Sequence, residues 1–271
     1  MIGTGVELPT DLLQLSLRWV HVLAAVLWVG TTFWLEWAWR DPAGAPLGRR
    51  VVELLARTLF WLRWGAAAAW LTGASLLMVL YYSGPYFLRS GVRPELGEWG
   101  PVFAGLCLSF LVYDLAFRVA GTRVLPQLVF GVACGAGLIA FGRWLESRGV
   151  SNRAVFAHLG GLLGTSMAGN VWMRIGPCWR RALEARRRGE RPQLGDLATA
   201  ASRSRHNAYM AFPLVMLMVG CDQPGLTGSG TDWPWIVGGL LAVGAALCAM
   251  VYAALDSLAG VADGPPGPPE A

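Results

Sequence analysis

Apolar segments long enough to cross a bilayer recur along the whole chain and are separated by short polar connections. A hydrocarbon core about 30 Å thick needs roughly 20 largely apolar residues per helix. Seven segments approach or meet that length, and they lie near residues 12–38, 62–84, 99–120, 124–145, 152–176, 206–222 and 233–255. The pattern therefore predicts an all-α membrane protein, built as a bundle of about seven transmembrane helices.

The sixth segment is the weakest of the seven. Its purely apolar part covers only residues 208–220, which is too short to span the bilayer unless Arg205, His206 and Asn207 lie at headgroup depth. We therefore expect this helix to begin in the interface. The bundle is predicted as one transmembrane domain over residues 1–260, followed at 261–271 by a Pro/Gly-rich tail that we expect to be disordered.

The placement of arginines predicts an orientation, because short cytoplasmic connections of membrane proteins are enriched in basic residues. No lysine is present, and arginines concentrate between the fifth and sixth segments, whereas the next connection has acidic residues and no arginine. This favours a bacterial inner-membrane protein with a periplasmic N-terminus and a cytoplasmic C-terminus. Arg143, Arg148 and Arg153 run against the rule, since this orientation places them outside.

Composition and cysteine spacing exclude several functional classes. The chain is 55% hydrophobic and 14% charged, and its basic residues are not interleaved with aromatics in a polar region, so nucleic acid is not an expected partner. The five cysteines stand alone, without CxxC or CxxCH, which argues against a disulfide framework, a zinc knuckle or a covalent c-type haem. There is also no P-loop, no GxGxxG before a helix and no Ser-His-Asp set.

The three histidines are the strongest candidates for cofactor chemistry. His21 lies in the first predicted span, His158 in the fifth and His206 at the start of the sixth. Ionisable side chains at membrane depth are costly and therefore mark candidate functional sites. At 1.5 Å per residue, His21 and His158 are both roughly 9–14 Å below the predicted outer surface, and His206 enters from the opposite side. We therefore predict that His21 and His158 ligate the iron of a haem b.

Small and aromatic residues share helix faces with these two histidines. Trp28 follows His21 by two turns, and Gly161 and Thr165 follow His158 at helical spacing. Such faces give a macrocycle an aromatic wall and room for close approach. Small residues are equally typical of helix packing in lipid, and intramembrane histidines also serve as interhelical hydrogen bonds or proton relays, so the pattern alone leaves these alternatives open.

A second polar group is predicted near the cytoplasmic side. Its arginine, imidazole, amide and hydroxyl groups suit a cavity for a small planar anion, or alternatively an interfacial belt. The residues are Asn170 in the fifth span and Arg205, His206, Asn207 and Tyr209 at the start of the sixth. Asp114 and Arg118, four residues apart in the third span, are interpreted instead as a local structural ion pair.

Five motifs together resemble the membrane domain of the bacterial membrane-bound, cytochrome-c-linked urate oxidase family, over roughly residues 12–222. They are RWVHVLAAVLWVG at 18–30, WLTGASLLMVLYYSGPYFL at 70–88, YDLAFR at 113–118, FAHLGGLLGTSMAGNVW at 156–172 and RHNAYMAFPLVMLM at 205–218. The family pattern includes His21, Trp28, His158, Gly164, Asn170, His206, Asn207 and Tyr209. The resemblance implies oxidation of urate with electrons passed to cytochrome c, and Asn170, His206, Asn207 and Tyr209 as candidate catalytic residues.

The chain departs from that family in its last segment, which lacks the basic and aromatic ending, and in having no CxxCH domain after it. We therefore expect a separate cytochrome c, or a subunit of a respiratory complex, to accept electrons. One alternative is a non-enzymatic haem b anchor that relays electrons within such a complex. Another is a cofactor-free assembly or transport protein in which the histidines only hydrogen-bond between helices.

Overall fold

The computed structural model describes residues 8–38, 49–120, 124–228, 230 and 232–262, and this part of the chain is almost entirely helical. Its one β-type pairing is an isolated bridge between Leu88 and Val150. The helices are α1 (Leu8–Phe33), η1 (Trp34–Ala38), α2 (Arg49–Leu76), η2 (Leu77–Tyr82), α3 (Leu96–Ala120), α4 (Val124–Ser147), α5 (Asn152–Asn170), η3 (Val171–Ile175), α6 (Gly176–Arg187), α7 (Leu194–Gly220), α8 (Pro224–Thr227) and α9 (Trp233–Ala262), where η marks a π-helix.

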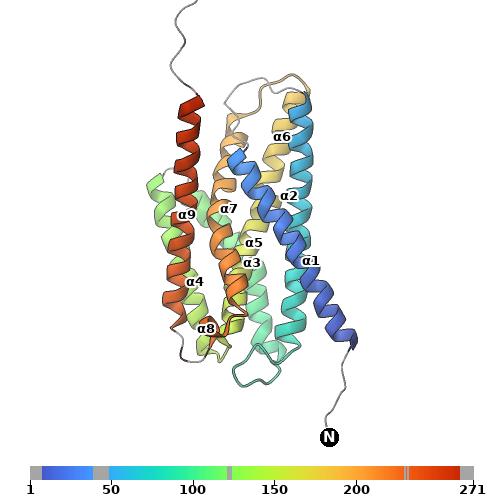
Figure 1. Ribbon diagram of the computed structural model, residues 1–271, viewed down its shortest axis with the longest axis vertical. Helices are drawn as coiled ribbons and strands as arrows, with labels where there is room; N and C mark the ends of the chain where they lie inside the picture. The colour runs from blue at the N-terminus through green and yellow to red at the C-terminus, as the bar shows by residue number, and fades with distance from the viewer. Residues whose placement is uncertain (1–7, 39–48, 121–123, 229, 231, 263–271) are drawn as a thin grey trace, which may run out of the picture.

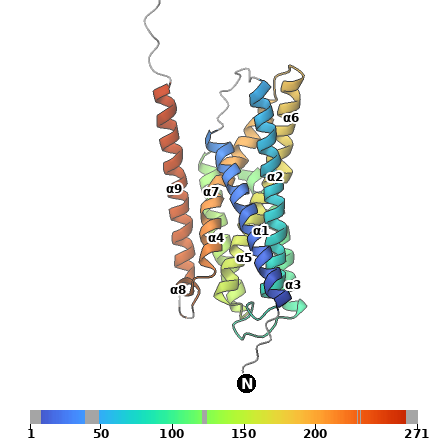
Figure 2. The same ribbon diagram turned by 45° about the vertical axis from the view of Figure 1, so that its right-hand side comes forward.

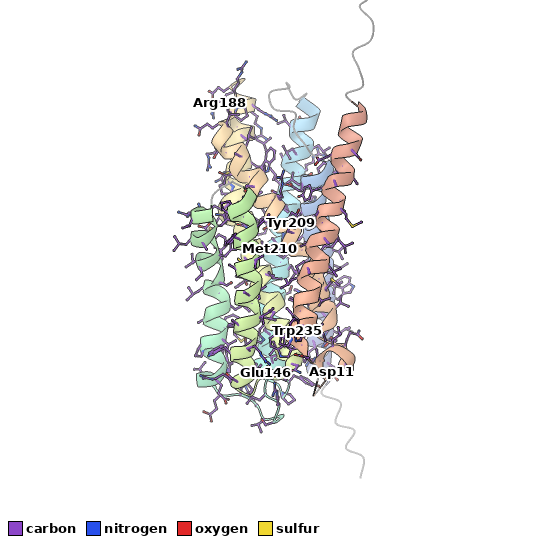
Figure 3. The ribbon with its side chains drawn as sticks, turned by 90° about the vertical axis from the view of Figure 1, so that its left-hand side faces the viewer. Asp11, Glu146, Arg188, Tyr209, Met210 and Trp235 are labelled. Atoms are coloured by element: carbon purple, nitrogen blue, oxygen red, sulfur yellow. The ribbon has the colours of Figure 1, made fainter. Side chains whose placement is uncertain are left out.

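The long helices run side by side with alternating direction, and α5, η3 and α6 form one continuous rod (Figure 1). Helix α1 crosses the bundle obliquely, whereas α9 stands on the other side of it (Figure 2). The α6–α7 connection with Arg188 lies at one end, here called the arginine-rich end, and Asp11 and Glu146 lie at the other (Figure 3). The start of α1 and the end of α9 are therefore at opposite ends.

Five helices in the described part of the chain are long and apolar enough to cross a membrane: Asp11–Glu36, Val52–Tyr82, Leu96–Val119, Pro126–Ser147 and Trp233–Ser257. Large apolar side chains such as Trp19, Val26, Val112 and Val132 are exposed on their outer faces. Water would penalise so much exposed apolar surface, so the surroundings of this bundle are lipid. The predicted all-α membrane class is confirmed, but only five of the predicted seven spans meet this criterion.

Helix α5 is too polar to meet the criterion because it lies inside the bundle. His158 and Asn170, at opposite ends of it, are completely buried. It packs against α2, α3, α4 and α7, so protein rather than lipid surrounds its polar groups. A helix shielded in this way does not need an apolar sequence.

The glycines of α5 serve helix packing. A Cβ on Gly161 would lie 2.8 Å from Leu106 of α3, and one on Gly169 would overlap the ring of Phe110. On the other side, a Cβ on Gly160 would lie 2.7 Å from Met218 of α7. Neighbouring helices thus fill the small-residue faces, as in the packing alternative described above.

The helices extend beyond their apolar stretches at the arginine-rich end. Helix α2, the second predicted span, begins at Arg49 rather than near residue 62. Helix α7, the sixth predicted span, begins at Leu194 rather than near residue 206. Helix α6 packs against α7 there, and Arg181 donates to Asp196 at 2.9 and 2.5 Å. That hydrogen-bonded guanidinium keeps the pKa of Asp196 below its ordinary value. Helix α9 ends at Ala262, and the rest of the predicted tail lies outside the described residues.

We predict that Gly169→Ala destabilises the bundle by about 1–3 kcal/mol, because the new methyl group overlaps Phe110 and α3 must shift. Gly164→Ala is the matched control, since its Cβ would make an ordinary contact with Leu214 at 3.8 Å. Thermal unfolding in detergent measures both. Equal unfolding temperatures would contradict the close approach of α3 to α5.

Candidate functional site

The carboxylate of Asp114 binds three arginines from three helical segments. Arg118, one turn later on α3, donates Nε and Nη2 to Oδ2 at 3.0 and 2.7 Å. Arg174 on η3 donates Nε to Oδ1 at 2.9 Å and Nη2 to Oδ2 at 2.5 Å. Arg203 on α7 donates Nη2 to Oδ1 at 2.7 Å. The predicted local pair of Asp114 and Arg118 does form, but it is one part of a larger cluster.

This cluster has two more positive charges than negative ones. Asp114 and Arg203 are buried, with 5% and 3% of their surface exposed. The side chains of Arg118 and Arg174 are 59% and 30% exposed, so the cluster has an accessible edge. Asp114 lies six residues before the end of α3, which is roughly 9 Å from the arginine-rich end of that helix. The buried pair of Asp114 and Arg203 balances in charge, and the excess cations are the accessible Arg118 and Arg174, where an anion from solvent can bind.

Arg203 continues the cluster into a network of amides. Its Nη1 donates to Oδ1 of Asn170 at 3.1 Å. The amide nitrogen of Asn170 donates to the hydroxyl of Tyr113 at 3.0 Å and to Oδ1 of Asn207 at 2.8 Å. Asn207 in turn donates to the carbonyl of Met167 at 3.1 Å. Both asparagines are completely buried and fully engaged, so their positions are fixed.

Tyr113 connects this network to His206. The Tyr113 oxygen accepts from Asn170, so its own hydrogen is directed at Nδ1 of His206, 2.8 Å away. Nε2 of a neutral His206 then carries the ring proton. The imidazole lies among the rings of Tyr113, Phe117 and Phe130, with centroids 5.3–5.6 Å away. The result is an oriented imidazole donor beside a cationic cluster.

A π-helical turn contributes to the shape of this site. Asn170 is the last residue of α5, and Arg174 lies in η3, which follows directly. A π-turn widens the helix by one residue per turn, so these two residues, four apart, point to the same side, toward α3 and α7. Single π-turns in α-helices occur frequently at functional sites.

The structure divides the predicted anion-binding residues between two faces of α7. Asn170, His206 and Asn207 lie together, as described above. Tyr209 instead stacks on Tyr252 of α9 at 5.8 Å, at mid-height in Figure 3. Arg205 shares that second face, 5.4 Å over the ring of Tyr252 and 3.7 Å from Glu36. Residues 205 and 209 are one turn apart on the face opposite residues 203 and 207, which separates the two groups.

His158 has both ring nitrogens engaged within the protein. Its Nδ1 donates to the carbonyl of Ala154 at 2.6 Å, which leaves Nε2 to accept from the hydroxyl of Tyr82 at 2.7 Å. Tyr82 also stacks on Trp99 at 4.7 Å. His158 is thus a buried connection between α5 and η2, and neither nitrogen is left for an iron ion.

His21 and His158 both lie below the Asp222 end of the bundle, because Arg18, one turn before His21, and Arg153, five residues before His158, both pair with Asp222. Nδ1 of His21 is 2.9 Å from the carbonyl of Ala69 and 3.1 Å from the hydroxyl of Thr72, both on α2. Ligation of a haem b by this pair stays a prediction, and it would require Nε2 of His158 to exchange its hydrogen bond with Tyr82 for the iron.

The other predicted haem-contacting residues lie within helix interfaces. Trp28 is buried between α1 and α2, and its backbone lies 3.3 Å from the position that a Cβ on Gly65 would take. Its indole nitrogen has no hydrogen-bond partner among the described residues. Thr165 accepts from the indole of Trp70 at 3.0 Å. Gly161 faces Leu106, as described above. None of them contacts His21 in a hydrogen bond or ring pair that the structure describes.

Sequence reasoning missed Tyr113, Arg174 and Arg203. The two arginines were interpreted only as indicators of membrane orientation, and Asp114 was assigned to a local pair. The signal in the sequence was Asp114 itself, an isolated acid within an apolar segment. A buried carboxylate needs cationic partners, so arginines from neighbouring helices were to be expected beside it.

Comparison with known proteins identifies the family. The family model described as urate oxidase N-terminal matches residues 51–260. This range contains all residues of the Asp114 cluster and the last helix, but not α1 with His21 and Trp28. No curated protein and no solved structure matches the chain significantly. Because the match covers more than half of its length, the chain belongs to the urate oxidase N-terminal family.

Proposed function

We propose that this protein oxidises urate at the Asp114 cluster, in the inner membrane of a bacterium, and passes the electrons to a separate cytochrome c. The observation that carries the proposal is the excess of two positive charges in a partly buried cluster of three arginines and one aspartate. Urate is a small planar anion with one negative charge at neutral pH, so it would neutralise part of this excess. Family membership gives independent support for urate as the substrate class.

The residues of the cluster have the groups that a planar anion needs. Guanidinium groups donate pairs of parallel hydrogen bonds to adjacent oxygen atoms in one plane. Arg118 and Arg174 keep an accessible edge, and they would bind the anion first. His206, oriented by Tyr113, would donate a hydrogen bond or exchange a proton with the substrate. Asn170 and Asn207 hold Arg203 and Tyr113 in place.

Electron balance requires an acceptor. Oxidation of one urate releases two electrons, which reduce two ferric cytochromes c to the ferrous state while protons leave to solvent. Because both ring nitrogens of His158 are hydrogen-bonded within the protein, no step of this proposal passes through a haem in this chain. No observation favours the alternative function, a non-enzymatic haem b anchor that relays electrons within a respiratory complex.

The proposed topology has seven crossings, with the arginine-rich end in the cytoplasm. Helices α5 and α7 run through the bundle beside the five apolar spans, and α5 is shielded from lipid by its neighbours (Figure 1). Connections that are rich in basic residues stay on the cytoplasmic side of the membrane. Urate would then reach the Asp114 cluster from the cytoplasm.

We predict that Arg203→Lys lowers kcat/KM for urate about 10- to 100-fold, because lysine cannot donate to Asp114 and Asn170 in the same fixed geometry. Arg205→Lys is the matched control two residues away on the opposite face of α7 and should stay within about threefold of the wild type. Steady-state assays with cytochrome c test both. Equal losses would contradict the location of the site.

Two Tyr→Phe variants test the same site with smaller changes, which are less prone to disturb folding. Tyr113→Phe removes the hydroxyl that orients His206, whereas Tyr252→Phe removes a buried hydroxyl that donates to Glu36. We expect the first to lose roughly tenfold in kcat/KM with little change in unfolding temperature, since one hydrogen bond is worth about 1 kcal/mol. The second should retain activity. Full activity of Tyr113→Phe would remove His206 from the proposal.

We predict that Asp114→Asn destabilises the protein by about 3–5 kcal/mol, because the change leaves the buried Arg203 without its counter-charge. The control is Glu190→Gln, which removes one partner of the exposed pair with Arg188 and should change stability by less than about 1 kcal/mol. Thermal unfolding in detergent measures both. An anion that binds these arginines should raise the unfolding temperature of Asp114→Asn by more than that of the wild type, because the variant has lost the counter-charge of all three.

The acceptor requirement is tested under anaerobic conditions with purified protein and urate. We expect sustained urate loss only when oxidised cytochrome c is supplied, with two cytochromes reduced per urate. The Arg203→Lys variant is the negative control. Sustained loss without an acceptor would contradict the partner requirement, and no urate-dependent reduction of any one-electron acceptor would contradict the urate assignment itself.

A further inference from the structure

A lateral apolar groove lies between α2 and α3, with α5 as its floor. Its volume is about 350 Å³. Both walls pack against α5 and are barely in contact with each other over the residues that the structure describes. The lining consists of apolar and small side chains, including Ala66, Ala67 and Trp70 of α2, Phe110 of α3, and Gly169 and Trp172 of α5 and η3. The groove faces lipid, because its walls are two of the membrane-spanning helices.

An arginine stands at the end of this groove nearest the arginine-rich end. Arg63 precedes Ala66 and Ala67 by three and four residues, so it shares their face of α2. Its guanidinium lies 4.5 Å over the ring of Trp172, and its stem packs against Gly176. Nε is buried without a hydrogen-bond partner, and no carboxylate neutralises Arg63 in the described part of the chain. The groove therefore combines an apolar body with an uncompensated cation.

Exposed aromatics place Arg63 at headgroup depth. Phe60, Trp61 and Trp64 surround it on α2, and each has about half of its surface exposed. Trp and other aromatic side chains gather at membrane–water interfaces, where an apolar ring and a polar edge are both accommodated. An arginine at this level meets lipid phosphates, while the groove below it meets acyl chains.

We propose that this groove binds one anionic phospholipid, with its phosphate on Arg63 and one acyl chain along Trp70 and Phe110. Charge complementarity carries the choice of ligand: a neutral hydrocarbon would fill the groove but leave Arg63 unpaired. A zwitterionic lipid would bring a cationic headgroup close to the same guanidinium. The site is separate from the Asp114 cluster, so this inference stands whether or not urate is the substrate.

The test uses the purified, delipidated full-length protein in detergent, with phosphatidylglycerol, phosphatidylcholine or inorganic phosphate added. Native mass spectrometry counts bound lipids, and thermal unfolding gives apparent affinities. We expect phosphatidylglycerol to bind at least about fivefold more tightly than phosphatidylcholine, in line with one arginine near an anionic headgroup, and phosphate alone to have no effect. Equal binding of the two lipids would overturn the proposal.

Three variants locate the site. Arg63→Gln should abolish the preference for phosphatidylglycerol, whereas Arg57→Gln, an exposed arginine earlier on the same helix, should leave it unchanged. Ala67→Phe fills the groove and should weaken both lipids. If Ala67→Phe does not fold, Leu71→Trp fills the groove from a position that is 60% exposed. A preference that survives Arg63→Gln would overturn the assignment, as would one that Arg57→Gln removes.

Discussion

The Asp114 carboxylate is the constraint on which the centre of this bundle depends. It binds arginines from α3, η3 and α7, and so fixes three helical segments relative to one another through a single charged group. Burying a carboxylate at this depth costs free energy unless cations surround it. Burying the cations costs free energy unless the carboxylate is present. Since the arginines outnumber it, the cluster holds the helices together and still favours a further anion.

This constraint also explains why α5 and α7, two of the three long helices that form the site, have weak membrane signals, whereas the third, α3, meets the criterion. Asn170, Arg203 and Asn207 reduce the hydropathy of α5 and α7, and the surrounding spans keep these groups away from lipid. The function of the polar residues thus requires apolar neighbours. A hydropathy profile therefore misses α5 and α7, because it measures contact with lipid rather than position in the bundle.

Each sequence pattern predicts only the structural property on which it depends. Apolar length predicted the helical class, and residue type alone selected Asn170, His206 and Asn207, which the structure brings together. Depth counting put His21 and His158 near the same end, where Arg18 and Arg153 both reach Asp222, but it could not show that Tyr82 engages the second nitrogen of His158. Arg203 was missed because the positive-inside rule explains any arginine near a connection and so conceals the ones that turn inward.

The depth of the cluster follows from the cost of its charge. Two uncompensated arginines at the centre of the bilayer would be prohibitive, but near the end of α3 the side chains of Arg118 and Arg174 still reach water. On the buried side, Arg203 lies over the ring of Phe117 of α3 at 3.8 Å. An anion that replaced this water would meet donors already held in position by Asp114 and Asn170, so it would pay little to organise them. A cationic site of this composition is therefore most effective at the boundary between membrane and solvent, which is where the fold places it.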